Sequence, residues 1–403
     1  MTTPPDRLAI DGGTPVRSTL LPYARQVIDE RDIAAVTEAL RSDWLTTGPR
    51  VPAFESLLAA ATGARHAVAF SSGTAALHGA AASAGLGPGD EAITTPMTFV
   101  ATANAVVYVG ATPRFADVRP GSLLIDPDRV GEAVTRRTKA ILPVDYAGQP
   151  ADYDALRTIA EGAPGGPLTV IADASHSLGA SFAGRSVGTL ADLTVLSLHP
   201  AKIMTTGEGG AVLTDRDDLA AALRRFRNHG IETELAARRD WTYAMVELGF
   251  NYRLTDVAAA LGQAQLERLD EFLARRRHLA ARYRQLLADQ PFLELPDVDP
   301  RSDPAWHFMF IRLRLDRLRV DRGTVFHAMR AEGIGVNVHY IPVHDHPYYR
   351  ARFPDLTYPV AESAYERLLT LPLHAAMTDA DVDDVVAALA KVTSAYRAPE
   401  APG

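Results

Sequence analysis

The chain of 403 residues contains no cysteine, which excludes disulfide bonds and cysteine-ligated metal or iron–sulfur centres. Lysine is scarce as well, with three lysines against 38 arginines. The formal net charge of −8 supplies no basic field for a polyanion, so we predict no nucleic-acid partner. No apolar run approaches the roughly 18 residues that a bilayer span needs, and we predict no membrane partner. No secretory h-region follows Met1, and we expect a cytoplasmic protein.

The few lysines stand in different surroundings. Lys139 belongs to the polar stretch Arg136–Lys139, and Lys391 lies near the end of an alanine-rich helical pattern, so we expect both to be solvated charges. Lys202 instead follows the apolar run Leu193–Leu198 and precedes the glycine-rich stretch Thr205–Gly210. An amine can lose its proton and attack a carbonyl group, whereas guanidinium stays charged. Lys202 is therefore the first candidate for a Schiff-base nucleophile.

Short apolar runs alternate with helical patterns between about residues 30 and 215. This alternation is typical of an α/β fold with a mostly parallel central sheet and helices on both faces. We expect strands at His66–Ser71, Glu91–Thr95, Thr112–Ala116, Ala140–Val144, Leu168–Asp173, Leu193–Leu198 and Ala211–Thr214. We expect helices at Asp32–Arg41, Thr74–Ala84, Phe99–Val109 and Ala151–Ala160.

The second half of the chain predicts a smaller α+β domain. Apolar residues at helical spacing indicate one or two long helices over Thr255–Leu287, which lead from one domain to the next. We place a large domain with an N-terminal arm at residues 1–265 and a small C-terminal domain at 266–403. Within the small domain we expect a strand at Trp306–Leu315 and helices at Thr324–Glu332 and Asp379–Ala390.

Unusual residues collect where the predicted strands end, which is where open α/β sheets bind ligands. The turn Ser71–Ala75 follows a strand and opens a helix, which suits a phosphate group, although taken alone it favours a simple Ser/Thr helix cap. Asp173 ends a buried strand, and its carboxylate either meets a protonated ring nitrogen or caps the next turn. Lys202 alone could be a snorkelling surface lysine. Together, a phosphate turn, a carboxylate and an amine match the needs of pyridoxal 5′-phosphate (PLP).

The same segments resemble those of the DegT/StrS-type nucleotide-sugar aminotransferases, which are fold type I PLP enzymes. The likeness runs from about residue 20 to 390. It rests on Leu45–Pro49, Ser72–Leu77, Thr98–Asn104, Asp173–His176, Ser197–Lys202, Thr205–Gly210, Gly249–Arg253 and Leu371–His374. The resemblance implies a large PLP-binding domain and a smaller C-terminal domain.

The resemblance also implies roles for single residues. Lys202 would form the Schiff base with PLP, and Asp173 would keep the pyridine nitrogen protonated. These two and His176, which would lie against the phenolic oxygen side, form the predicted catalytic set. The remaining predicted cofactor ligands are Ser72, Gly73, Thr74 and Ser197 at the phosphate, Phe99 on the ring face, and Asn251. Phe99 as ordinary core packing is the alternative.

The position of Asn251 carries a prediction about assembly. The family builds its site at a homodimer interface, so Asn251 would reach the phosphate of the neighbouring subunit. We therefore expect a homodimer with shared active sites.

A narrower resemblance concerns the sugar. The segments His339–His344 and Ala376–Asp381 are similar to the UDP-4-amino-4,6-dideoxy-N-acetyl-altrosamine transaminase branch, although Asp345-His346 and Met97 depart from its common form. Predicted substrate-binding residues are Thr47, Arg253, His339, Tyr340 and His344. A structural ion pair is the alternative for Arg253. The histidines at 339, 344 and 346 lack a matching carboxylate spacing, so we predict no metal.

The resemblance implies a two-stage transamination from L-glutamate to a 4-keto-6-deoxy nucleotide sugar, with a UDP-linked N-acetylhexosamine as the expected acceptor. Lys202 would carry the proton between the substrate carbon and the cofactor, for which a lowered pKa is required. A PLP-dependent sugar dehydratase is disfavoured, because that branch has histidine in place of this lysine. A transaminase of a cyclitol or antibiotic precursor stays open, as does a non-catalytic PLP-fold sensor or scaffold.

Overall fold

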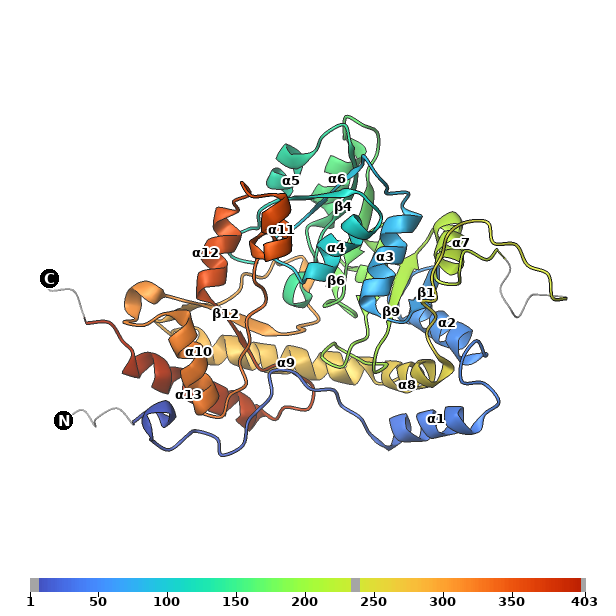
Figure 1. Cartoon of the computed structure of the whole chain (residues 1–403). Coiled ribbons are helices and arrows are strands. Elements are labelled where there is room, and N and C mark those ends of the chain that lie inside the picture. The colour runs from blue at the N-terminus through green and yellow to red at the C-terminus, as the bar shows by residue number, and fades with distance from the viewer. Residues whose placement is uncertain (1–6, 233–239, 400–403) are drawn as a thin grey trace.

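A seven-stranded sheet forms the centre of the large domain in this computed structural model, which describes residues 7–232 and 240–399 (Figure 1). The strand order is β1-β9-β8-β5-β4-β2-β3. The strands are β1 (His66–Phe70), β2 (Glu91–Thr94), β3 (Thr112–Phe115), β4 (Thr138–Leu142), β5 (Thr169–Asp173), β8 (Leu193–Ser197) and β9 (Gly210–Thr214). The pairs from β8 through β3 are parallel, and β9 is antiparallel to both β8 and β1. The mostly parallel α/β sheet is thus confirmed.

Helices cover both faces of the sheet because successive strand residues point to opposite sides. In β1, Ala67 and Ala69 join one apolar core, and Val68 and Phe70 join the other. The first core also takes side chains from α2, α6, α8 and the start of α9, and the second takes them from α3, α4 and α7. The large-domain helices are α1 (Glu30–Arg41), α2 (Arg50–Thr62), α3 (Gly73–Ser83), α4 (Val100–Tyr108), α5 (Pro127–Ala133), α6 (Tyr153–Glu161), α7 (Asp217–Phe226) and α8 (Asp256–Leu266).

The long helical pattern at Thr255–Leu287 folds as two helices, α8 and α9 (Leu269–Leu287). At the break between the two helices, the guanidinium of Arg268 is buried and pairs with Asp32 and Asp29 near the start of α1. From there α9 runs across the lower part of the molecule in Figure 1, with the N-terminal segment below it. Its first turns pack in the large-domain core, and its later turns pack in a separate core that includes Leu279 and Tyr283.

That separate core belongs to the smaller C-terminal α+β unit. Its sheet has the order β10-β12-β13. The predicted strand and helices are present as β12, α10 and α13. The elements are β10 (Leu293–Glu294), β12 (Met309–Leu313), α10 (Arg322–Ala331), α11 (Pro347–Arg352), α12 (Pro359–Arg367), β13 (Leu368–Leu371) and α13 (Asp379–Ala395). A third small sheet joins β6 (Ser181–Phe182) to β7 (Arg185–Ser186) and β11 (Ser302–Asp303).

The N-terminal arm lies along the small domain. Leu8 and Leu21 are buried in the small-domain core, and Gly335 N–H donates to Leu21 O. The grouping of this arm with the large domain at residues 1–265 stays a prediction. None of the helices in the described part of the chain is long and apolar enough to cross a membrane.

The structure tests the expectation that Lys139 and Lys391 are solvated charges. Lys139 is exposed, as expected, although it lies within β4 and not in a turn before it. The expectation for Lys391 is wrong. Its ammonium donates to Glu332 at 2.9 Å and to Thr14 O at 2.8 Å, and its side chain is only 14% exposed. Glu332 is fully buried, so Lys391 supplies the charge that this carboxylate needs.

Candidate active site

One cavity of about 510 Å³ opens where the carboxyl ends of β5 and β8 meet the first turns of α3 and α4. This is the edge at which α/β sheets bind ligands. Ten of the residues predicted for the site line this cavity. They are Ser72, Gly73, Thr74, Phe99, Asp173, His176, Ser197, Lys202, His339 and Tyr340.

Lys202 stands in the loop that follows β8. Its backbone N–H donates to His199 O at 2.9 Å, a tight turn that places the side chain among the cavity-lining residues. Burial lowers the pKa of the Lys202 ammonium from 10.5 to about 8, and the nearby Asp173 charge opposes this shift. Desolvation disfavours the charged form of an amine. Lys202 therefore has the lowered pKa that a nucleophile and proton carrier requires.

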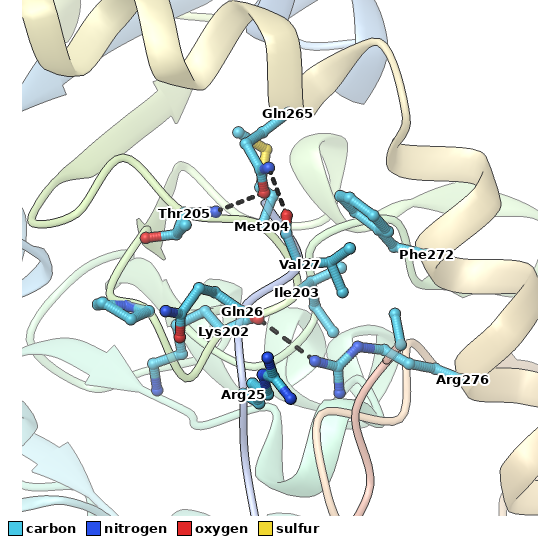
Figure 2. A pocket seen from close by; sticks show the side chains of 12 residues that line it. Arg25, Gln26, Val27, Lys202, Ile203, Met204, Thr205, Gln265, Phe272 and Arg276 are labelled. Carbon is cyan, nitrogen blue, oxygen red and sulfur yellow. Dashed lines mark hydrogen bonds between the residues drawn. The ribbon is translucent and has the colours of Figure 1, made fainter. Parts of the chain in front are cut away.

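A second set of contacts supports the Lys202 loop from behind (Figure 2). The Gln265 amide on α8 donates to Val27 O at 2.9 Å, and its oxygen accepts from Thr205 N–H at 3.4 Å. Arg276 on α9 donates to Lys202 O at 3.3 Å. The space between these side chains is about 10 Å³, the size of a single water. The loop is thus held on the side opposite to the large cavity.

Asp173 ends β5 and is only 5% exposed. Thr102 Oγ1 donates to its carboxylate at 2.7 Å, and Ser175 N–H donates at 3.2 Å. Within residues 7–232 and 240–399, no lysine or arginine pairs with this carboxylate. A buried carboxylate that faces a cavity and keeps a free acceptor position suits the N–H of a protonated pyridine.

The turn before α3 is shaped for close approach. Ser72 Oγ accepts from Ala75 N–H at 3.1 Å, so the helix-cap interpretation of this residue is confirmed. A Cβ on Gly73 would stand 2.9 Å from Ser197 Cβ and 3.0 Å from its oxygen, so only glycine fits between α3 and β8. The exposed first turn of a helix favours anions through its free N–H groups and its dipole. The residues present therefore fit a phosphate group of PLP.

A stack of aromatic rings forms the opposite wall. His176 packs on His307 with ring centroids 4.5 Å apart, and its Nε2 lies 3.1 Å from the Tyr340 hydroxyl. Burial, followed by the Lys202 charge, keeps the pKa of His176 well below its usual range, so the ring is neutral. Its Nδ1 is buried without a partner among the described residues. His176 thus lines the cavity with its Nε2 at the Tyr340 hydroxyl and its Nδ1 buried behind the ring.

His307 was missed by the sequence reasoning. It precedes β12, is 5% exposed and lines the cavity. Burial, followed by the His176 and Lys202 charges, lowers its pKa well below the usual value. In the sequence, His307 stands within an apolar run at the start of a predicted strand. This pattern does not show which strand ends of the large domain the histidine lies against.

The predicted substrate residues divide into two groups. His339 and Tyr340 line the cavity, and burial lowers the pKa of His339 to about 3. His344 lies elsewhere, 96% buried, with Nε2 2.9 Å from Glu362. Thr47 and Arg253 also lie outside the cavity lining; Thr47 bonds to Thr46 O, and Arg253 donates to Asn228 at 2.7 Å.

Asn251 is exposed and does not line the cavity of its own chain. Its backbone pairs with Asn228 in an antiparallel bridge. Phe99, by contrast, lines the cavity with 57% of its surface exposed, so its ring is not ordinary core packing in this chain. It begins α4 as the N-cap residue and lies 6.2 Å from the Tyr340 ring.

Comparison of the chain with known proteins identifies a family model that it matches and several similar proteins. Residues 26–390 match the model of the DegT/DnrJ/EryC1/StrS aminotransferase family. The chain is 40% identical to the spore coat polysaccharide biosynthesis protein SpsC of Bacillus subtilis over 380 residues, which are 93% of this chain and 97% of SpsC.

Two solved structures share the fold over nearly their whole length. The PLP form of Spr1654 from Streptococcus pneumoniae is 30% identical, with a TM-score of 0.87, covering 93% of this chain and 99% of that one. PseC of Helicobacter pylori, an aminotransferase involved in the biosynthesis of pseudoaminic acid, is 29% identical with a TM-score of 0.88, covering 94% and 100%.

Proposed function

The chain belongs to the DegT/DnrJ/EryC1/StrS aminotransferase family, and from that premise we propose that this PLP-dependent transaminase moves the amino group of L-glutamate to a 4-keto-6-deoxy nucleotide sugar. The acceptor we propose is a UDP-linked N-acetylhexosamine. The observation that carries the proposal is that Lys202, Asp173 and the turn around Gly73 line one cavity of about 510 Å³. A cavity of that volume is in the range of sites that hold a small-molecule ligand.

PLP, when bound, supplies an aldehyde that bonds an amine and a ring that takes up the electron pair of a breaking C–H bond. Asp173 would hold the ring nitrogen protonated, since its carboxylate accepts a hydrogen bond from N–H. Gly73, Thr74, Ser72 and Ser197 would bind the phosphate at the start of α3.

Lys202 is proposed to bond the cofactor aldehyde and, once released by the amino donor, to move the proton. A pKa of about 8 leaves part of the amine unprotonated near neutral pH, so it can accept a proton from the substrate carbon and return it. His176 stays neutral and would lie against the cofactor's phenolic oxygen side, where its ring lines the cavity. Phe99 would cover the ring face.

The assignment of the sugar rests on two supports. His339 and Tyr340, from the segment that resembles the altrosamine transaminase branch, line the cavity. PseC, a structural neighbour, acts in the biosynthesis of pseudoaminic acid. Thr47, Arg253 and His344 lie outside the lining in this chain, so any role for them in binding sugar would need a partner subunit or a rearranged loop.

The test is product analysis with purified protein. L-Glutamate is supplied with UDP-linked and dTDP-linked 4-keto-6-deoxy sugars and with a keto-cyclitol, and the aminated product is identified by mass spectrometry. We expect amination of the UDP sugar, with release of 2-oxoglutarate. Amination of the cyclitol alone would instead favour the antibiotic-precursor activity, and failure of glutamate to bleach the bound cofactor would overturn the donor.

Replacement of the proposed nucleophile tests the chemistry itself. Lys202→Arg keeps a positive charge but cannot lose its proton, so turnover should fall by several orders of magnitude, on the order of 10³-fold or more. Lys139→Arg is the matched control, since Lys139 is exposed on β4. Substantial remaining turnover in Lys202→Arg would refute the assignment.

A further inference from the structure

A fully buried arginine on α9 has no carboxylate beside it. Arg276 is 1% exposed, and in the described part of the chain no aspartate or glutamate pairs with it. Burial lowers the pKa of its guanidinium from 12.5 to about 10. A buried charge without a counter-charge is costly unless hydrogen bonds satisfy it. The contacts that do satisfy it are therefore informative.

Within the described part of the chain, every side-chain hydrogen bond of Arg276 goes to a backbone carbonyl, and its Nε is buried without a partner. Its Nη1 donates to Leu373 O at 2.9 Å, to His307 O at 3.0 Å and to Trp306 O at 3.3 Å. Its Nη2 donates to Lys202 O at 3.3 Å (Figure 2). The Arg276 side chain thus connects the loop after β8 with the residues just before β12 and with the segment after β13.

Two of those carbonyls belong to residues that line the active-site cavity. Lys202 presents its amine there, and His307 stacks on His176 at 4.5 Å. The Lys202 charge affects the pKa of both His176 and His307, so the amine and the stack are electrostatic neighbours. The Arg276 guanidinium holds the backbones of both Lys202 and His307 from behind the cavity. It therefore fixes the distance between the Lys202 amine and the two stacked histidine rings.

The position of Arg276 on α9 supports this role. Phe272, one turn before it, packs in the large-domain core, and Leu279 and Tyr283, after it, pack in the small-domain core. The Tyr283 hydroxyl donates to Pro372 O at 2.9 Å, next to the Leu373 carbonyl that Arg276 holds. Arg276 therefore stands where the two cores meet.

We propose that Arg276 is a positioning residue, whose guanidinium sets the placement of the Lys202 amine against the His176–His307 stack. The planar fork of arginine presents several donors in fixed directions, which the single ammonium of lysine cannot do. This inference rests on the proposed role of Lys202.

The test compares Arg276→Met and Arg276→Lys with the matched control Arg275→Met. Arg275 is the preceding residue on α9 and also donates to a carbonyl, Met377 O at 2.7 Å, but that carbonyl lies outside the cavity lining. Thermal unfolding of each apoprotein establishes that it is folded. Steady-state kinetics with L-glutamate and the keto sugar that the product analysis identifies as acceptor, and visible circular dichroism per bound cofactor, are then measured.

We expect Arg276→Met to lose on the order of 10- to 100-fold in kcat with KM nearly unchanged, since misplacement of a reacting group lowers the rate more than binding. The visible circular dichroism of the cofactor should change as well, and Arg276→Lys should fall between Arg276→Met and the natural protein. Arg275→Met should leave both measurements unchanged.

A folded Arg276→Met with the kcat and cofactor dichroism of Arg275→Met would overturn the inference. If Arg276→Met does not fold, the same two measurements on Arg276→Lys decide, because that variant keeps the buried charge. An active Lys202→Arg would instead overturn the proposed function, so the two failures are distinguishable.

Discussion

At the scale of single residues, the site depends on ionisable groups that are buried in the wall of the cavity. Burial moves the pKa of the Lys202 ammonium downward because removing a cation from water favours its neutral form. The same effect keeps His176 and His307 neutral. Among residues 7–232 and 240–399, Asp173 is the charge that offsets the Lys202 ammonium, and it opposes the shift in pKa without cancelling it. The lysine is thus reactive because of where it is buried.

The pKa of Lys202 can be measured in the apoprotein by competitive labelling with an amine-reactive reagent. Only the unprotonated amine reacts, so the labelling rate of Lys202 should rise with pH and reach half its plateau near pH 8. Peptide mass spectrometry separates the three lysines, and the exposed Lys139 serves as the internal reference. A Lys202 rate that still climbs steeply up to pH 10.5, the ordinary lysine value, would contradict a lowered pKa.

At the scale of elements, short apolar runs and helical patterns predicted most of the large domain. The expected strands agree with β1 to β5, β8 and β9 to within a few residues. Helix α2 was missed because its exposed face carries apolar residues such as Ala53, Leu57 and Ala60, so no polar face marks the helix in the sequence. The placement of Lys391 was wrong for a related reason. The sequence of α13 shows which of its residues are polar. It does not show that Glu332, at the end of α10, lies against Lys391.

The Lys391–Glu332 pair predicts a measurable loss of stability. Glu332 also accepts from Ala9 N–H at 2.9 Å and from Val16 N–H at 3.0 Å, so it fastens the N-terminal arm. Lys391→Met leaves this buried carboxylate without its cation and should lower the free energy of unfolding by about 3–5 kcal/mol in a urea titration.

The control is an exposed pair on the same domain. Arg282 and Asp383 are bonded at 2.6 Å with side chains 33% and 47% exposed. Arg282→Met should therefore cost at most about 1 kcal/mol. Equal losses in the two variants would show that Glu332 does not depend on Lys391.

At the scale of the whole molecule, the segment from Trp241 to Leu248, just before Asn251, carries highly exposed apolar side chains. Trp241 is 88% exposed and Leu248 is 75% exposed, and the segment projects from the body beside α7 (Figure 1). Clustered exposed apolar groups mark interaction surfaces. Asn251 is exposed at the end of the same segment, away from its own cavity. These features support the proposed homodimer, in which Asn251 reaches the partner's site.

Mixed dimers test the shared site. Lys202→Arg and Asn251→Ala are each expected to be inactive or strongly impaired alone. In a mixed dimer, one site would combine an intact Lys202 with an intact Asn251 from the other subunit. Random exchange of equal amounts should then restore about one active site in four, measured as turnover. No recovery after exchange would place Asn251 in the site of its own chain or outside any site.

The sequence by itself determined that the main residues of the candidate site stand at the ends of strands. Ser71–Ala75, Asp173 and Lys202 each follow an apolar strand, and the carboxyl ends of parallel strands share one edge, so their meeting was predictable. Gly73 was predictable too, because a turn against a neighbouring strand excludes a Cβ.

Tertiary structure alone decided the remaining features. His307 and Arg276 come from the small domain and the helix that leads to it, and no periodic pattern reports which large-domain loop they meet. The same holds for Lys391 against Glu332. Local patterns record which side of an element is buried, whereas the partner on that side depends on packing between elements far apart in the chain.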